Sequence, residues 1–205
     1  NLNSMTHNNY VLERRNVLDN TNTLNNYNSQ KISTRRLVFC SLFAALLCIS
    51  AYLSIPTPLP MAPKITLINF VLFIIALLFP VTDSFLIVLV WFLLGLVGIP
   101  VYIGGGAGIG YLLAPYGAYT WAFPIVSIIL PLIRGKKYNR IRYTICALIG
   151  VVIIDGIGMI YLKSTMNYNW LMAFTTGFLA FIPLDIVKAV IAAQIIPAFN
   201  KAINY

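Results

Sequence analysis

The chain has 205 residues, of which 60% are hydrophobic and only 9% are charged. A soluble domain carries about 25% charged residues, so this composition excludes a soluble enzyme, and the apolar excess excludes a wholly disordered chain. The net charge of +9 is not carried by a basic domain with interleaved aromatic residues, so we predict no nucleic-acid partner.

Residues 1–34 form a polar, Asn-rich segment with few apolar side chains. Such a segment cannot build a core, and we predict a flexible cytoplasmic tail in front of a membrane domain at residues 35–205. The segment holds no apolar core followed by a small-residue cleavage site, so we do not interpret it as a secretory signal.

From residue 37 onward, long apolar stretches alternate with Pro-rich, Gly-rich or charged segments. Stretches of this kind favour transmembrane helices over a β-barrel. A further apolar stretch, 170–181, precedes Pro183, a residue well suited to start a helix, so we predict that 170–181 is a short separate segment outside the membrane. The six predicted spans are residues 37–54, 65–79, 84–97, 111–133, 143–162 and 183–203.

Two clusters of basic residues orient these spans. Arg35 and Arg36 precede the first span, and the second cluster lies at 134–142, between the fourth and fifth spans. Lys and Arg are enriched in cytoplasmic loops, and six crossings place both clusters and both termini inside. The Pro-rich loop 55–63 and the Gly-rich loop 98–110 then lie outside. The predicted fold class is an all-α integral membrane protein.

Asp185 and Lys188 begin the sixth span at the spacing i, i+3, which places them on one helix face. One interpretation is a mutual salt bridge that neutralises both groups. The other is a ligand site in which Lys188 meets an anionic group and Asp185 accepts N–H donors. The positive dipole end of the helix at Pro183 also favours an anion.

Two further features are candidates for ligand contact. Asp155 lies within the fifth span, where an ionisable group is costly and therefore a functional candidate, or else a protonated residue that holds two helices together. The Gly-rich loop 98–110 offers backbone groups that a ligand can approach closely, or serves as a connector. The chain has no GxxxxGK[ST] motif, so it cannot hydrolyse ATP by that route.

Small residues recur every fourth position in the first span, at Cys40, Ala44 and Cys48, with Ser41 and Ala45 in a parallel row. Such a stripe lets two helices approach closely. The partner is either another span of the chain or a separate membrane protein.

Four segments, in order, carry a resemblance to a known family. They are SLFAAL at 41–46, ITL at 65–67, the Gly-rich stretch 96–110 followed by PYGAY at 115–119, and FIPLDIVKA at 181–189. This ordered set resembles the BioY family, the biotin-specific substrate-binding (S) component of energy-coupling factor (ECF) transporters. The Asn-rich tail lies outside the resemblance.

The resemblance implies six helices in the plasma membrane of a prokaryotic cell and capture of biotin from outside. It also implies delivery to a membrane scaffold component with two ABC-type ATPase subunits, and no enzymatic activity or cofactor of its own. Asp185 and Lys188 are expected to contact biotin, and Cys40, Ala44 and Cys48 the scaffold component. The full set of predicted binding residues is Asp185, Lys188, Gly105, Gly106, Tyr111, Tyr119 and Asp155.

The chain departs from the family pattern at Tyr116, Leu184 and Asp155, where we expect Thr, Gly and no acid. Three alternatives stay open. The chain could bind another small vitamin, work as a secondary transporter driven by protons through Asp155, or act as an intramembrane enzyme with Asp155 and Asp185 as an acid pair. No clear inverted repeat supports the secondary transporter, and no histidine or metal set within the spans supports the enzyme.

Overall fold

The computed structural model describes residues 14–15, 34–55, 65–115 and 117–203. Apart from residues 14, 15 and 34, the predicted flexible tail lies outside the described residues, and so does almost all of the predicted Pro-rich loop. The chain divides into two units, Asn1–Phe39 and Cys40–Tyr205. Of the first unit, the described residues 14–15 and 34–39 are helical. The second unit holds the helical bundle.

Each predicted span corresponds to one long helix, and short elements fill the connections. The long helices are α2 (Thr34–Ser50), α3 (Ile68–Leu78), α4 (Val81–Leu96), α6 (Ala118–Ile133), α7 (Arg140–Met166) and α9 (Ile182–Ile203). The short elements are β1 (Ser54–Ile55), β2 (Ile65–Thr66), α5 (Gly108–Leu113), α8 (Trp170–Phe174) and a π-helical turn, η1 (Thr175–Leu179).

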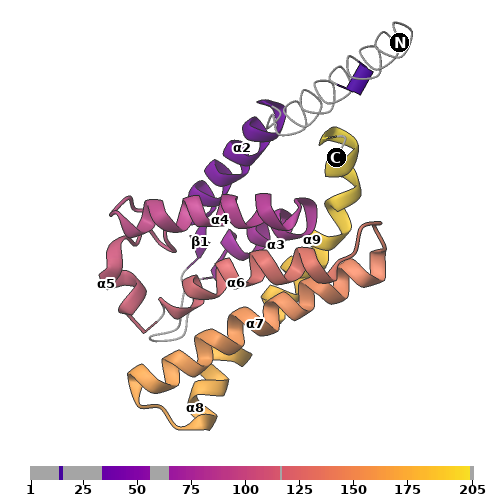
Figure 1. The fold of residues 1–205 in the computed structure, drawn as a ribbon. Helices are drawn as coiled ribbons and strands as arrows, with labels where there is room; N and C mark the ends of the chain where they lie inside the picture. Colours follow the sequence, from indigo (N-terminus) through magenta and orange to yellow (C-terminus); the bar gives the residue numbers. More distant parts are fainter. Residues whose placement is uncertain (1–13, 16–33, 56–64, 116, 204–205) are drawn as a thin grey trace, which may run out of the picture. The chain divides into compact units, whose positions relative to one another are not determined.

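The helices of the second unit pack as a bundle around α3. Figure 1 shows α4, α6 and α7 lying side by side, and α3 and α9 pack against this layer and against each other. Every residue of α3 from Leu72 to Leu78 is buried. A helix that is apolar on all faces belongs in a core, and INFVLFIIALL is such a sequence.

The outer helices carry apolar side chains on their exposed faces as well. On α6 and α7 these residues recur at intervals of three or four, which is one face of a helix. A soluble monomer rarely exposes apolar stripes of this length, whereas a lipid bilayer covers them. The exposed residues are Trp121, Ile125, Ile128 and Leu132 on α6, and Ile141, Ile145, Ile149 and Val152 on α7.

Two helical stretches, Arg140–Met166 and Trp170–Lys201, are long and apolar enough to cross a membrane by themselves. The four other apolar helices, Arg36–Ser50, Ile68–Leu78, Val81–Leu96 and Ala118–Ile133, are 10–17 residues long. The structure thus confirms a helix at each of the six predicted spans, and the number of crossings stays a prediction.

The predicted fourth span, 111–133, is wrong at its start. Tyr111 belongs to the separate short helix α5, and α6 begins only at Ala118. The reason is Pro115, because a residue before proline is disfavoured in the helical conformation and Ala114 is extended, with φ −67° and ψ 156°. The predicted fifth span, 143–162, is too short at both ends.

The ends of α7 follow from two asparagines. The Asn139 side chain accepts hydrogen bonds from the backbone N–H groups of Ile141 and Arg142, which caps the helix start. Asn167 adopts the left-handed conformation that ends it. The segment that follows, α8 with η1, is set off from α9 by a turn at 180–181. Its predicted place outside the membrane stays a prediction.

Candidate functional site

The candidate site is centred on the first two turns of α9. Asp185 and Lys188 form an ion pair across one turn, as the i, i+3 spacing predicts. The Asp185 side chain is buried and Lys188 is partly exposed. The structure thus shows the ion pair of the first interpretation, and the ligand site stays a prediction. A ligand would use the hydrogen-bonding capacity that the pair leaves over.

Asn69 in the first turn of α3 and Thr66 in β2, just before this helix, also belong to the cluster. The side-chain amide of Asn69 donates to Oδ2 of Asp185 at 3.1 Å, and Nζ of Lys188 donates to the backbone carbonyl of Thr66 at 3.0 Å. Thr66 belongs to β2, which pairs antiparallel with β1. The sequence analysis did not include either residue among the site residues, because each lies more than a hundred positions from its partner.

Asp155 joins this cluster from α7. It is buried at 1% exposure, and its Oδ2 atom has no hydrogen-bond partner among the described residues. Asp155 interacts electrostatically with both Asp185 and Lys188. Three helices, α3, α7 and α9, thus contribute two carboxylates, one ammonium group and one amide to one cluster, and binding of a ligand by these groups stays a prediction.

Tyr119 lies near the start of α9 but its hydroxyl group has a structural partner. The hydroxyl donates to the backbone carbonyl of Gly177 at 2.6 Å, which ties α6 to η1. The Tyr119 ring packs edge-on against Phe181, with centroids 5.7 Å apart. The structure therefore gives Tyr119 a packing role, and its contact with a ligand stays a prediction.

The position of the Tyr119 ring requires glycine at position 158. A Cβ atom there would lie 2.1 Å from Cε1 of Tyr119, whereas Gly156, two residues earlier on α7, has open space. We expect Gly158→Ala to destabilise the protein by about 1–3 kcal/mol through overpacking. Gly156→Ala should be neutral or up to about 1 kcal/mol stabilising, because alanine favours the helix. Thermal unfolding in detergent measures both, and equal melting temperatures for the two variants would contradict this packing.

The Gly-rich loop folds around Tyr102, a residue that the sequence analysis did not single out. Its hydroxyl donates to the backbone carbonyl of Phe92 at 2.6 Å, and its backbone N–H donates to Gly106 at 3.0 Å. Its ring stacks on Tyr111, with centroids 5.1 Å apart. Burial, together with the nearby Tyr111, raises the pKa of Tyr102 to about 12, so this hydroxyl stays protonated as a donor.

The predicted ligand residues Gly105 and Gly106 lie in this loop, and Tyr111 lies in α5, which follows it. Gly105 has a φ of 81°, which favours glycine. A Cβ atom at Gly106 would lie 2.2 Å from the Tyr111 ring. Burial raises the pKa of the Tyr111 hydroxyl. The structure thus gives these residues a packing role, and their contact with a ligand stays a prediction.

Two backbone hydrogen bonds connect the Gly-rich loop to the charged cluster through the end of α2. Gly104 donates to the Ala51 carbonyl at 3.0 Å, and Leu67, next to Thr66, donates to the Leu53 carbonyl at 3.2 Å. The loop and the site therefore share one end of the bundle, in agreement with the sequence analysis.

The small-residue stripe of α2 lies beside the face that packs on the bundle. Phe43 is buried against Phe79, with centroids 5.0 Å apart, and against Phe199 of α9 at 6.0 Å. Cys40, Ala44 and Cys48 have intermediate exposure, and the parallel row Ser41 and Ala45 is exposed. Both rows are thus accessible to some degree, and the more exposed one is Ser41 and Ala45.

The fold defines a helical protein whose apolar outer faces suit a lipid bilayer, with a small charged cluster at one end of its bundle. The BioY family model matches residues 23–205, and this chain belongs to the BioY family. The match begins inside the Asn-rich segment, so the expectation that the whole segment lies outside the resemblance is wrong.

Comparisons with individual proteins support this family assignment. The chain is 36% identical to the probable biotin transporter BioY of Pyrococcus horikoshii over 80% of this chain and 95% of that protein. It is 30% identical to the biotin transporter BioY of Thermotoga maritima, over 82% of this chain and 96% of that protein. It also matches the crystal structure of the S-component for biotin from an ECF-type ABC transporter, with a TM-score of 0.75 and 25% identity. The match covers 84% of this chain and 94% of that chain.

Proposed function

We propose that this protein captures biotin outside the cell and delivers it to an ATP-driven ECF transporter. The observation that carries the proposal is the cluster of Lys188, Asp185 and Asn69 at one end of a bundle that matches a biotin S-component. The curated relatives are named as transporters, which argues against the intramembrane enzyme.

The chemistry of the cluster suits biotin, which has a carboxylate at one end and a ureido group with two N–H donors at the other. Lys188 has three donors, of which Asp185 and the Thr66 carbonyl use two, so one is left for the ligand carboxylate. Asp185 binds Lys188 and Asn69 and retains lone pairs that can accept the ureido N–H groups.

The test of this function uses the purified full chain in detergent, without any ATPase. Titration with biotin in a calorimeter should give tight binding of one ligand per chain. Reconstituted into liposomes, the same chain should bind biotin without accumulating it, whether or not a pH gradient is present. Lack of binding would contradict the proposal.

A second candidate, the proton-coupled transporter, has one specific observation in its favour. The unpartnered Oδ2 of buried Asp155 lies in the same electrostatic cluster as Asp185 and Lys188. Accumulation of biotin in the liposomes under a pH gradient, abolished by Asp155→Asn, would establish this function instead.

We further propose a multi-pass topology in the plasma membrane of a prokaryotic cell, with six crossings and both termini inside. The basic segment 134–142 supports it, because exposed Lys136, Lys137 and Arg140 favour the cytoplasmic side. The ATP-driven step would need a scaffold component and two ABC-type ATPase subunits, since the chain has no ATP-binding motif of its own.

Cysteine labelling tests this topology. Asn139 and Asn167 are exposed residues at opposite ends of α7. With native cysteines replaced by alanine, a membrane-impermeant thiol reagent should label Asn167→Cys in intact cells. It should label Asn139→Cys only after the membrane is opened, because α7 crosses the bilayer between them. The reverse pattern would contradict the orientation.

A further inference from the structure

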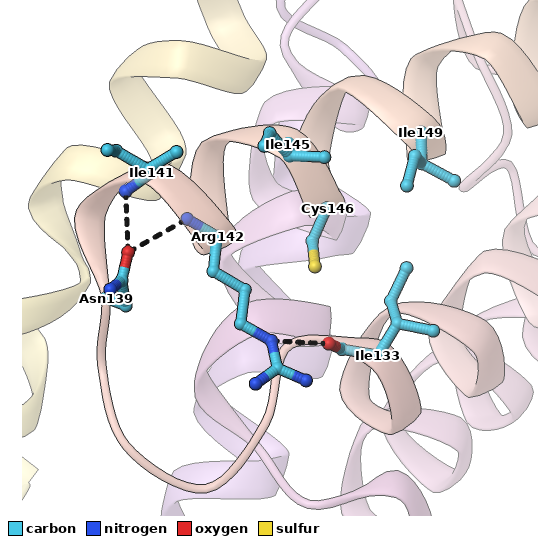
Figure 2. A pocket seen from close by; sticks show the side chains of 7 residues that line it. All are labelled: Ile133, Asn139, Ile141, Arg142, Ile145, Cys146 and Ile149. Atoms are coloured by element: carbon cyan, nitrogen blue, oxygen red, sulfur yellow. Dashed lines mark hydrogen bonds between the residues drawn. The ribbon is translucent and has the colours of Figure 1, made fainter.

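An open groove of about 470 Å³ lies between the end of α6 and the start of α7, on the part of α7 that precedes Asp155. Figure 2 shows its lining, in which Arg142 reaches from α7 to the end of α6. We call this hollow the α6–α7 groove. Its lining residues are Ile133, Asn139, Ile141, Arg142, Ile145, Cys146 and Ile149.

The body of the groove is apolar and open toward the region that lipid would fill. Ile141, Ile145 and Ile149 follow at intervals of four residues along α7, so they form one stripe on its surface. All three are exposed, Ile141 to 71%. A hydrocarbon chain is the ligand that such a stripe accommodates, since it offers no hydrogen-bonding groups.

The mouth of the groove is cationic. Nε of Arg142 donates to the backbone carbonyl of Ile133 at 3.0 Å, which fixes the guanidinium there and leaves its other N–H groups without a partner among the described residues. Lys136, Lys137 and Arg140 are exposed in the adjoining segment, and no carboxylate of the described part of the chain forms an ion pair with them.

We propose that the α6–α7 groove binds one anionic phospholipid, with an acyl chain along the isoleucine stripe and the phosphate at Arg142. Charge complementarity identifies this occupant. A guanidinium matches the geometry of a phosphate, and basic pockets between membrane helices bind anionic headgroups. A soluble phosphate would leave the apolar stripe uncovered, and a zwitterionic lipid would gain less from four unpaired cations.

The test measures which lipids stay with the full chain. The protein is reconstituted in nanodiscs of equal amounts of phosphatidylglycerol and phosphatidylcholine, extracted with a mild detergent, and the retained lipids are quantified by mass spectrometry. The wild type should retain phosphatidylglycerol in about fivefold excess, which is the contribution of one well-placed cation at a membrane surface. Millimolar inorganic phosphate should not displace it, because phosphate lacks the acyl chain.

Two variants and one control distinguish lipid binding in the groove from non-specific attraction of anionic lipid to the basic surface. Arg142→Gln should bring the ratio close to one, and so should Ile145→Trp, which fills the groove and keeps every charge. The control is Lys163→Gln, at the other end of α7, where Lys163 lies over the Trp170 ring; it should keep the excess. Because Arg142→Gln could disturb the fold, Ile145→Trp serves as the second test of the groove. The exposed triple variant Lys136→Gln/Lys137→Gln/Arg140→Gln should keep most of the excess, since Arg142 still holds the phosphate.

No phosphatidylglycerol excess in the wild type would overturn the proposal. An excess that survives Ile145→Trp but not the charge variants would also overturn it, since the lipid would then be held by surface charge alone. Displacement by inorganic phosphate would identify the site as one for a soluble anion. None of these results depends on biotin binding, so they do not test the proposed function.

Discussion

Lys188→Ala should weaken biotin binding about tenfold to hundredfold. The variant removes a charged hydrogen-bond donor to the ligand carboxylate, which contributes about 1.5–3 kcal/mol. It also leaves Asp185 without its ion-pair partner in a buried position, so the variant could lose affinity simply by losing structure. A biotin amide, which has no carboxylate, separates the two effects and should bind the wild type and Lys188→Ala with similar affinity.

Asp185→Asn should behave differently toward the same two ligands. Its proposed partner is the ureido group, which biotin and its amide share, so both ligands should lose affinity together. Calorimetry in detergent with two ligands and three proteins gives the complete comparison. If Lys188→Ala weakens both ligands equally, Lys188 supports the fold of the site instead of binding the carboxylate.

Ala44→Trp should abolish most biotin uptake by the assembled transporter while the isolated chain still binds biotin. A bulky side chain in the small-residue stripe prevents the close approach of a second helix. Because Ala44 is partly covered within the chain and Ala45 is exposed, Ala45→Trp is the cleaner second variant. Uptake in cells and biotin binding by the purified chain are measured side by side.

The matched control for these variants is Ile125→Trp, on the exposed face of α6. It places an equally large side chain toward lipid, outside the proposed interface, and should leave uptake unchanged. If all three variants lower uptake equally, the loss reflects membrane insertion and not a specific helix contact. If neither α2 variant affects uptake or assembly, the small-residue stripe packs within the chain.

The parts of the site that lie on one helix were predictable from sequence. Asp185 and Lys188 share a face because their spacing is i, i+3, and Pro183 indicates where that helix begins. Asn69 and Thr66 were not predictable in this way. They meet α9 only because α3 and α9 pack together, and a single sequence contains no signal for that pairing.

The fold shows the same division between local and distant information. Hydropathy predicted a helix at each of the six apolar spans, because each span must bury or cover its own apolar side chains. The break between α5 and α6 could have been read from Pro115, which disfavours a helical residue before it. The role of Tyr102 could not have been predicted from sequence. Its hydroxyl reaches the Phe92 carbonyl on α4 only because the Gly-rich loop folds back onto that helix.

The most direct test of the account is a calorimetric titration of biotin into the wild type and the double variant Asp185→Asn/Lys188→Ala. The double variant removes both charges of the ion pair together, so neither is left unpaired in the core and the fold should persist, as its melting temperature will show. We predict tight, one-to-one binding by the wild type and a loss of at least about tenfold in the double variant. Unchanged biotin binding by a folded double variant would contradict the assignment of the site to α9.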